Sequence, residues 1–135
     1  MLNTCAEKFK RLLEDKEFNF KSGIDNDGDS YIFFPYNGKN AQLFFTAEDG
    51  KYLSIYLCFE KVPEDKVTDV IFACNEMNIR FKWVTFYVDK DNDVMLHLDE
   101  LLSVEHAEDE AFELLLRLFN ICDDAKPIIM KAIYA

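Results

Sequence analysis

The sequence predicts an α+β protein in which helices pack on one face of an antiparallel β-sheet. Two observations predict this class. The hydrophobic period changes from helical to alternating and back along the chain, and short turn signals separate the alternating segments. The expected order is one helix, four strands, a second helix, two strands and a third helix. Strands joined by short turns pair antiparallel, and three helices can cover one face of their sheet.

The first helix is expected from Thr4 to about Lys16. Thr4 and Glu7 have the spacing of a capping box, in which each side chain bonds to the backbone of the other residue. Apolar residues then recur at helical spacing. They are Cys5, Phe9, Leu12 and Leu13.

Alternation predicts four strands between residues 18 and 59, divided by the turn signals Asp27-Gly28, Asn37-Gly38 and Asp49-Gly50. The strands are expected at Phe18–Ile24, Ser30–Tyr36, Ala41–Ala47 and Lys51–Phe59. Both faces of the last strand are apolar, so something is expected to cover each of them. Helices on one side and a second subunit on the other would do this, and so would a partner protein.

The second helix is expected to open at Pro63, which suits a first helical position, and to end at Asn78. Its expected buried stripe is Val67, Val70, Ile71, Cys74 and Met77. A hairpin follows, with strands at Phe81–Asp89 and Val94–Leu98. The third helix is expected to start after Ser103 or His106 and to be interrupted at Asp123 and Asp124. A separate amphipathic tail then begins at Lys126-Pro127.

Length and charge limit the function. The 135 residues suit a single domain covering residues 1–135. A net charge of -11 argues against nucleic acid and anionic membrane surfaces as partners, because both select clustered Lys and Arg. The acidity favours solubility or a basic partner segment. The first residues lack the pattern of a signal peptide and no apolar run reaches membrane-spanning length, so a cytoplasmic protein is expected.

No residue pattern predicts catalysis, a cofactor or a metal site. The four cysteines are scattered within apolar stretches and are expected to be buried thiols. The acidic runs Asp25-Asp27-Asp29 and Asp89-Asp91-Asp93 alternate like calcium loops, but Ser30 and Val94 stand where such a loop needs glycine. Both runs are therefore interpreted as solvated hairpin turns.

Four aromatic residues are candidates for partner binding, because aromatic side chains are enriched at interface hot spots. Ordinary packing in a sheet is the alternative interpretation, since aromatic residues also favour strands. The candidates are Tyr52, Tyr56, Trp83 and Tyr87.

The segment Ala73–Asn78, the following Phe81–Asp89 and the helix Phe112–Phe119 resemble the YbjN family. Its members are described as putative bacterial sensory transduction regulators, and its fold is similar to that of type III secretion chaperones. The resemblance implies a homodimer and a regulatory, non-enzymatic role. Asn75 and Asn78 match the family's Asn pair and are expected to cap the helix and bond neighbouring backbone. The alternative function is a secretion chaperone that binds a segment of a partner polypeptide.

Overall fold

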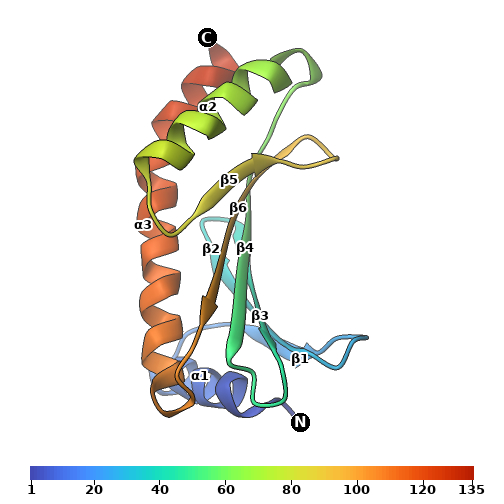
Figure 1. Ribbon diagram of the computed structural model, residues 1–135, viewed down its shortest axis with the longest axis vertical. Helices are drawn as coiled ribbons and strands as arrows, with labels where there is room; N and C mark the ends of the chain where they lie inside the picture. The colour runs from blue at the N-terminus through green and yellow to red at the C-terminus, as the bar shows by residue number, and fades with distance from the viewer. The chain divides into compact units, whose positions relative to one another are not determined.

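The computed structural model describes residues 1–135 and contains three α-helices and one six-stranded sheet (Figure 1). The strand order is β1-β2-β3-β4-β6-β5, and the hairpins β1–β2, β2–β3 and β5–β6 pair antiparallel. This confirms the predicted α+β class and element order. The elements are α1 Thr4–Asp15, β1 Lys21–Ile24, β2 Ser30–Tyr36, β3 Lys39–Thr46, β4 Tyr52–Lys61, α2 Val67–Arg80, β5 Thr85–Val88, β6 Asp93–Leu101 and α3 Ala107–Tyr134.

The chain divides into two compact units, which are described separately. The first contains Met1–Tyr56 and Asp99–Leu115, and the second contains Leu57–Leu98 and Leu116–Ala135. Strands β4 and β6 and helix α3 each contribute residues to both units. The two units therefore share three continuous elements.

In the first unit, α1 packs on one face of the sheet. Its buried Phe9 has its ring centroid 5.9 Å from that of Phe45 on β3. Alternate residues of the strands complete this core, as the two-residue period of a strand requires. They include Ile32, Ala41, Leu43, Leu53 and Ile55. The opposite face carries a row of half-buried aromatic side chains.

The start of α1 differs from the prediction. Asn3, and not Thr4, is the N-cap residue, and its Oδ1 accepts a hydrogen bond from the backbone N–H of Ala6 at 3.2 Å. The Asn3 side chain also donates from Nδ2 to the Phe45 carbonyl oxygen at 2.8 Å. Thr4 is instead the first residue of the helix, and the Glu7 N–H that its hydroxyl was expected to bond donates to the Asn3 carbonyl oxygen at 2.9 Å, so the predicted capping box is wrong.

In the second unit, α2 packs against β5. The predicted stripe is partly wrong, because Val70, Ala73, Cys74 and Met77 are buried whereas Ile71 is 51% exposed. The helix also begins later than predicted. Pro63 precedes a short 3-10 turn at Glu64–Lys66, and α2 starts at Val67.

Strand β5 begins at Thr85 and not at the predicted Phe81. The N–H of Phe81 bonds to the carbonyl of Met77 and so still belongs to the end of α2. Trp83 then adopts a φ of 80°, which lies outside the extended region of a strand. Residues 81–84 therefore form the turn from helix to strand.

Two further predictions are corrected by burial. Cys58 is exposed, because it alternates on β4 with the buried Leu57 and Phe59. Helix α3 runs through Asp123, Asp124 and Pro127 without interruption. The two aspartates face solvent, while a buried stripe continues at helical spacing on the other side of the helix. The stripe in the second unit is Leu118, Cys122, Ala125, Ile129 and Ile133.

We predict that the chain unfolds in one cooperative transition, because β4, β6 and α3 belong to both units and cannot unfold in one unit alone. Urea unfolding is followed by far-ultraviolet circular dichroism, which reports on the whole chain, and by the fluorescence of Trp83, the single tryptophan, in the second unit. The two curves should coincide. Separate midpoints would show that the units are independent domains.

Candidate functional site

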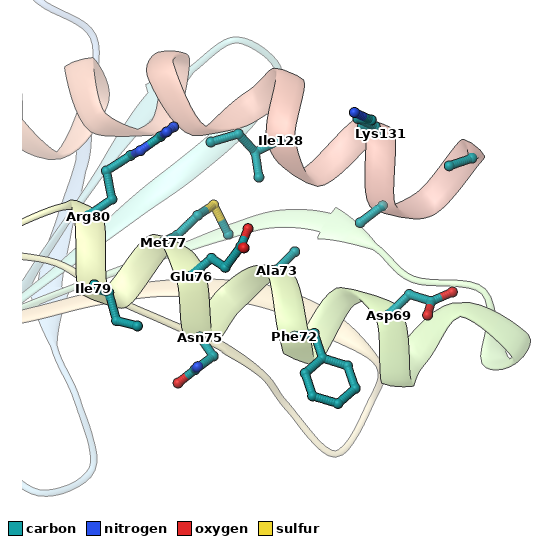
Figure 2. A pocket seen from close by; sticks show the side chains of 12 residues that line it. Asp69, Phe72, Ala73, Asn75, Glu76, Met77, Ile79, Arg80, Ile128 and Lys131 are labelled. Atoms are coloured by element: carbon teal, nitrogen blue, oxygen red, sulfur yellow. The ribbon is translucent and has the colours of Figure 1, made fainter.

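A groove of about 920 Å³ is lined by residues of α2 and of the last turns of α3 in the second unit (Figure 2). Its apolar lining includes Phe72, Met77 and Ile79 from α2 and Ile128 from α3. Figure 2 shows Phe72 and Ile79 on the side of α2 away from α3, where their side chains point outward. The charged lining residues are Asp69, Glu76, Arg80 and Lys131.

Large apolar side chains of α2 are exposed to solvent. The exposed fractions are 51% for Ile71, 68% for Phe72 and 81% for Ile79, and we call these three residues the α2 apolar surface. Contiguous exposed apolar residues in a folded protein mark interaction surfaces. The sequence analysis missed this surface. Its signal is the uninterrupted apolar run from Val70 to Cys74, because the buried side of one helix cannot hold five consecutive residues.

The predicted aromatic candidates of the first unit, Tyr52 and Tyr56, lie on the same face of β4. Tyr52 is 51% exposed, and the Lys51 ammonium lies 5.7 Å from its ring centroid. Tyr56 is half-buried, with its ring 6.0 Å from that of Phe44 in an edge-to-face arrangement. Phe44 in turn contacts Phe33, so Tyr56 belongs to a packed aromatic row.

The other two candidates, Trp83 and Tyr87, lie in the second unit. Trp83 is 55% exposed, and the Arg117 guanidinium lies 5.4 Å from its ring centroid, at cation–π distance. Tyr87 is half-buried on β5. The four aromatic candidates are therefore divided between the two units.

The two asparagines of α2 have different surroundings. Asn78 donates from Nδ2 to the Phe86 carbonyl oxygen at 2.9 Å, and its Oδ1 accepts from the Phe86 N–H at 2.7 Å. Asn75 is exposed and lines the groove. The side chain of Asn78 thus joins α2 to the backbone of β5, and the helix itself continues to Arg80.

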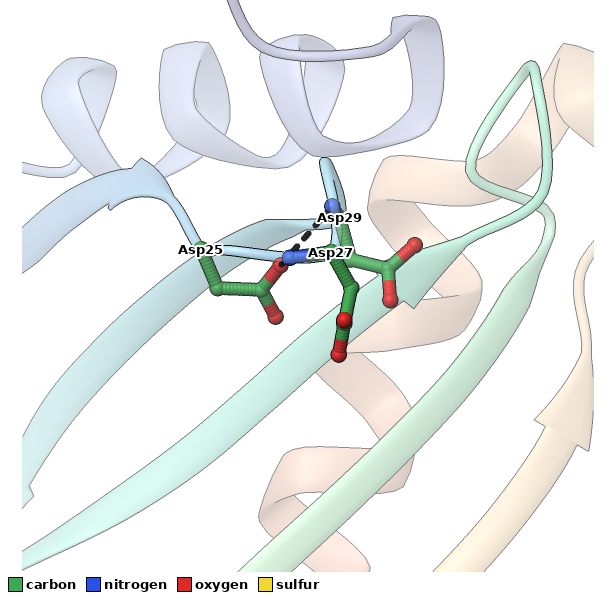
Figure 3. Close-up of side chains that lie close together, drawn as sticks. All are labelled: Asp25, Asp27 and Asp29. Atoms are coloured by element: carbon green, nitrogen blue, oxygen red, sulfur yellow. Dashed lines mark hydrogen bonds between the residues drawn. The ribbon is translucent and has the colours of Figure 1, made fainter.

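The two acidic turns have the same internal hydrogen bonds. Oδ1 of Asp25 accepts from the N–H groups of Asp27 and Asp29 (Figure 3). Oδ1 of Asp89 accepts from the N–H groups of Asp91 and Asp93 in the same way. In each turn the fourth residue, Gly28 or Asn92, has positive φ, which these two residue types tolerate.

The carboxylates of Asp25, Asp27 and Asp29 lie within 4.8 Å of one another. Partial desolvation, with the charges of Asp25 and Asp27, raises the pKa of the Asp29 carboxyl. The turn therefore concentrates negative charge at the end of β1.

Three of the four cysteines, Cys5, Cys74 and Cys122, are buried, and none forms a disulfide. Burial raises the pKa of the Cys74 thiol to about 11. Burial, followed by the charge of Asp49, raises the pKa of the Cys5 thiol. Both thiols are neutral at pH 7 and are poor nucleophiles.

Comparison with known proteins identifies relatives of this fold. The YbjN family, described as "Putative bacterial sensory transduction regulator", matches residues 6–124. No curated protein matches the sequence. No helix in the structure is long and apolar enough to cross a membrane.

Three solved structures share the architecture. YbjN from E. coli has 11% identity and a TM-score of 0.64, with 90% of each chain covered. The Yersinia pestis type III secretion chaperone SycH, solved with a fragment of YscM2, has 11% identity and a TM-score of 0.56 over 90% of this chain and 98% of that one. The ExsC–ExsE complex has 17% identity and a TM-score of 0.53 over 100% and 99%. The predicted resemblance to a chaperone-like fold is confirmed.

We predict that Asn78→Ala lowers the free energy of unfolding by about 1 to 3 kcal/mol, because it leaves the N–H and carbonyl of the buried Phe86 without their partners. Urea denaturation measures the change. Asn75→Ala is the matched control on the same helix and should change stability by less than about 0.5 kcal/mol, because the Asn75 side chain is also exposed but forms no hydrogen bond to another element. Equal effects of the two substitutions would contradict the role assigned to Asn78.

Proposed function

The chain belongs to the YbjN family, and from this premise we propose that it is a non-enzymatic regulator that acts by binding protein partners. The observation that carries the proposal is the α2 apolar surface, where three large apolar side chains are at least half exposed. Such a surface is costly to leave in water and is typical of a protein contact. The buried, neutral Cys5 and Cys74 thiols give no support to covalent catalysis.

We propose that the partner at the α2 apolar surface is a second copy of the chain, so that other protein partners bind elsewhere on the molecule. The charged residues of the groove support this choice, because acidic Asp69 lies near the start of α2 and basic Arg80 at its end. Two copies of α2 packed antiparallel about a two-fold axis would place Asp69 of each copy toward Arg80 of the other. Self-complementarity of this kind is what a symmetric dimer requires.

A secretion chaperone remains the second candidate function. SycH was solved with a fragment of YscM2, and ExsC with ExsE, so two proteins of this fold hold other polypeptides. For the present chain this supports a role in binding a segment of a partner polypeptide. A secretion chaperone and a regulator both bind a partner protein, and they differ in what happens to that partner afterwards.

We also propose a cytoplasmic location. None of the four cysteines forms a disulfide, and three of them are buried in the core as thiols. Cysteines that remain thiols are typical of proteins in reducing compartments.

Partner binding is tested by affinity capture of the tagged protein from native bacterial lysate, with quantitative mass spectrometry and a tag-only control. We expect at least one polypeptide to be captured in an amount comparable with the protein itself. Capture of nothing beyond the tag-only background would contradict the proposed binding function.

The dimer is tested by light scattering at micromolar concentration. The wild-type protein should have about twice the 15.8 kDa chain mass. The double variant Phe72→Glu/Ile79→Glu should be a monomer, because it places charges in the apolar contact. Leu101→Glu is the matched control, since Leu101 is 60% exposed but lies in the first unit, and it should remain dimeric. A monomeric wild-type protein, or a dimeric double variant, would contradict the proposed contact.

A further inference from the structure

The outer strands of the sheet are β1 and β5. Each has a strand neighbour on one side only, so alternate residues direct their N–H and carbonyl groups away from the sheet. Such an edge is a template for pairing with another extended chain unless something occupies it. The two edges of this sheet differ in this respect.

The edge of β5 is occupied from within the chain at Phe86. The Asp89 N–H donates to the Asp93 carbonyl oxygen, and this bond sets the register of the β5–β6 hairpin. Tyr87 then exchanges backbone hydrogen bonds with Met95, whereas the backbone N–H and carbonyl of Phe86 point away from β6. The Asn78 amide takes both outward groups of Phe86, at 2.9 and 2.7 Å. It therefore stands where the peptide group of an added strand would lie.

The edge of β1 has no such occupant. The Asp25 N–H donates to the Asp29 carbonyl oxygen, which sets the same alternation of backbone groups along β1. Gly23 exchanges backbone hydrogen bonds with Tyr31 of β2, whereas the N–H and carbonyl groups of Ser22 and Ile24 point away from β2. No side chain forms hydrogen bonds to the outward backbone groups of Ser22 or Ile24, as Asn78 does to those of Phe86. The Ile24 side chain is 47% exposed beside this edge.

The turns next to these edges differ in the same way. In the β5–β6 turn, Lys61 Nζ lies 3.7 Å from Asp93 Oδ1 and donates to the Asp91 carbonyl oxygen. In the β1–β2 turn no Lys or Arg forms an ion pair with Asp25, Asp27 or Asp29. The β5–β6 hairpin thus has the Asn78 amide at its edge and the Lys61 ammonium at its turn, whereas the β1–β2 hairpin has no such group at either place.

We propose that the outer edge of β1 binds an extended segment of a partner polypeptide by strand addition, with a Lys or Arg of that segment beside Asp25, Asp27 and Asp29. The partner's backbone would take the role that Asn78 has at β5, and its basic side chain the role of Lys61. This inference rests on the proposed protein-binding function and adds the site and the chemistry of the partner.

A second copy of this chain is disfavoured as the occupant of β1. Each copy carries a net charge of -11, and pairing β1 with β1 would bring two groups of three aspartates to one contact. Like charges placed opposite one another destabilise a strand pair. A basic segment removes this repulsion.

The probe is a fluorescein-labelled peptide of about seven residues with alternating Val and Lys and blocked ends, a length typical of one strand. Fluorescence anisotropy is measured at low salt with EDTA, so that metal ions do not occupy the carboxylates. We expect saturable binding with a Kd tighter than about 1 mM. The same peptide with Glu in place of Lys, and a version N-methylated at alternate residues, should each bind at least about tenfold more weakly, because they lack the charge or the backbone donors.

Two variants locate the site. Ser22→Pro removes an outward N–H that takes no part in the pairing with β2, and should weaken binding about tenfold. Asp27→Asn should weaken it about threefold, whereas Asp91→Asn, the same change at the corresponding position of the β5–β6 turn, should leave it unchanged. In the wild-type protein, added peptide should slow hydrogen exchange of the Ser22 and Ile24 amides, a readout independent of whether Ser22→Pro folds.

No saturable binding, equal binding of the N-methylated peptide, or unchanged exchange at Ser22 and Ile24 would each overturn the proposal. If the peptide experiments fail but a partner is captured from lysate, the proposed protein binding stands and only its assignment to β1 has failed. Failure to capture any partner would instead refute the proposed function itself.

Discussion

Alternate residues of β4 must be buried, and both units depend on this requirement. Leu53 and Ile55 lie in the core of the first unit, and Leu57 and Phe59 lie in that of the second, each no more than 2% exposed. Burying side chains of this size contributes roughly 1.5 to 3 kcal/mol each. A shift of one residue in register would turn all four outward and place Ser54 and Cys58 inside, so the position of β4 between β3 and β6 is strongly specified.

The features that were predictable from the sequence are those decided by local chemistry. Period-two alternation and the Asp-Gly and Asn-Gly turn signals located the strands, and Gly28 has the positive φ that such a turn needs. The errors arose where tertiary contacts override a local rule. Asp123, Asp124 and Pro127 suggest a helix end, yet the buried stripe on the other side of α3 keeps the helix continuous.

The candidate surfaces were less predictable than the fold. Whether Ile71 or Ala73 faces the sheet depends on the rotation of α2 about its axis, which helical spacing leaves open when five apolar residues are consecutive. The role of Asn78 depends on which residues of β5 face outward, and that is decided by pairing with β6. The family resemblance pointed to Asn75 and Asn78 together, but only the geometry separates an exposed groove residue from one that closes a sheet edge.

The N-cap of α1 has a consequence for the order in which the chain folds. Asn3 donates its backbone N–H to Ser30 Oγ at 2.9 Å and its side-chain amide to the Phe45 carbonyl, and these partners are 27 and 42 residues away. During synthesis on the ribosome, α1 emerges before either of these two partners. A short isolated helix is marginal in water, so α1 can be completed only after the β2–β3 hairpin has left the exit tunnel. Helix α1 is therefore made before the strands that it packs on but becomes stable no earlier than they do.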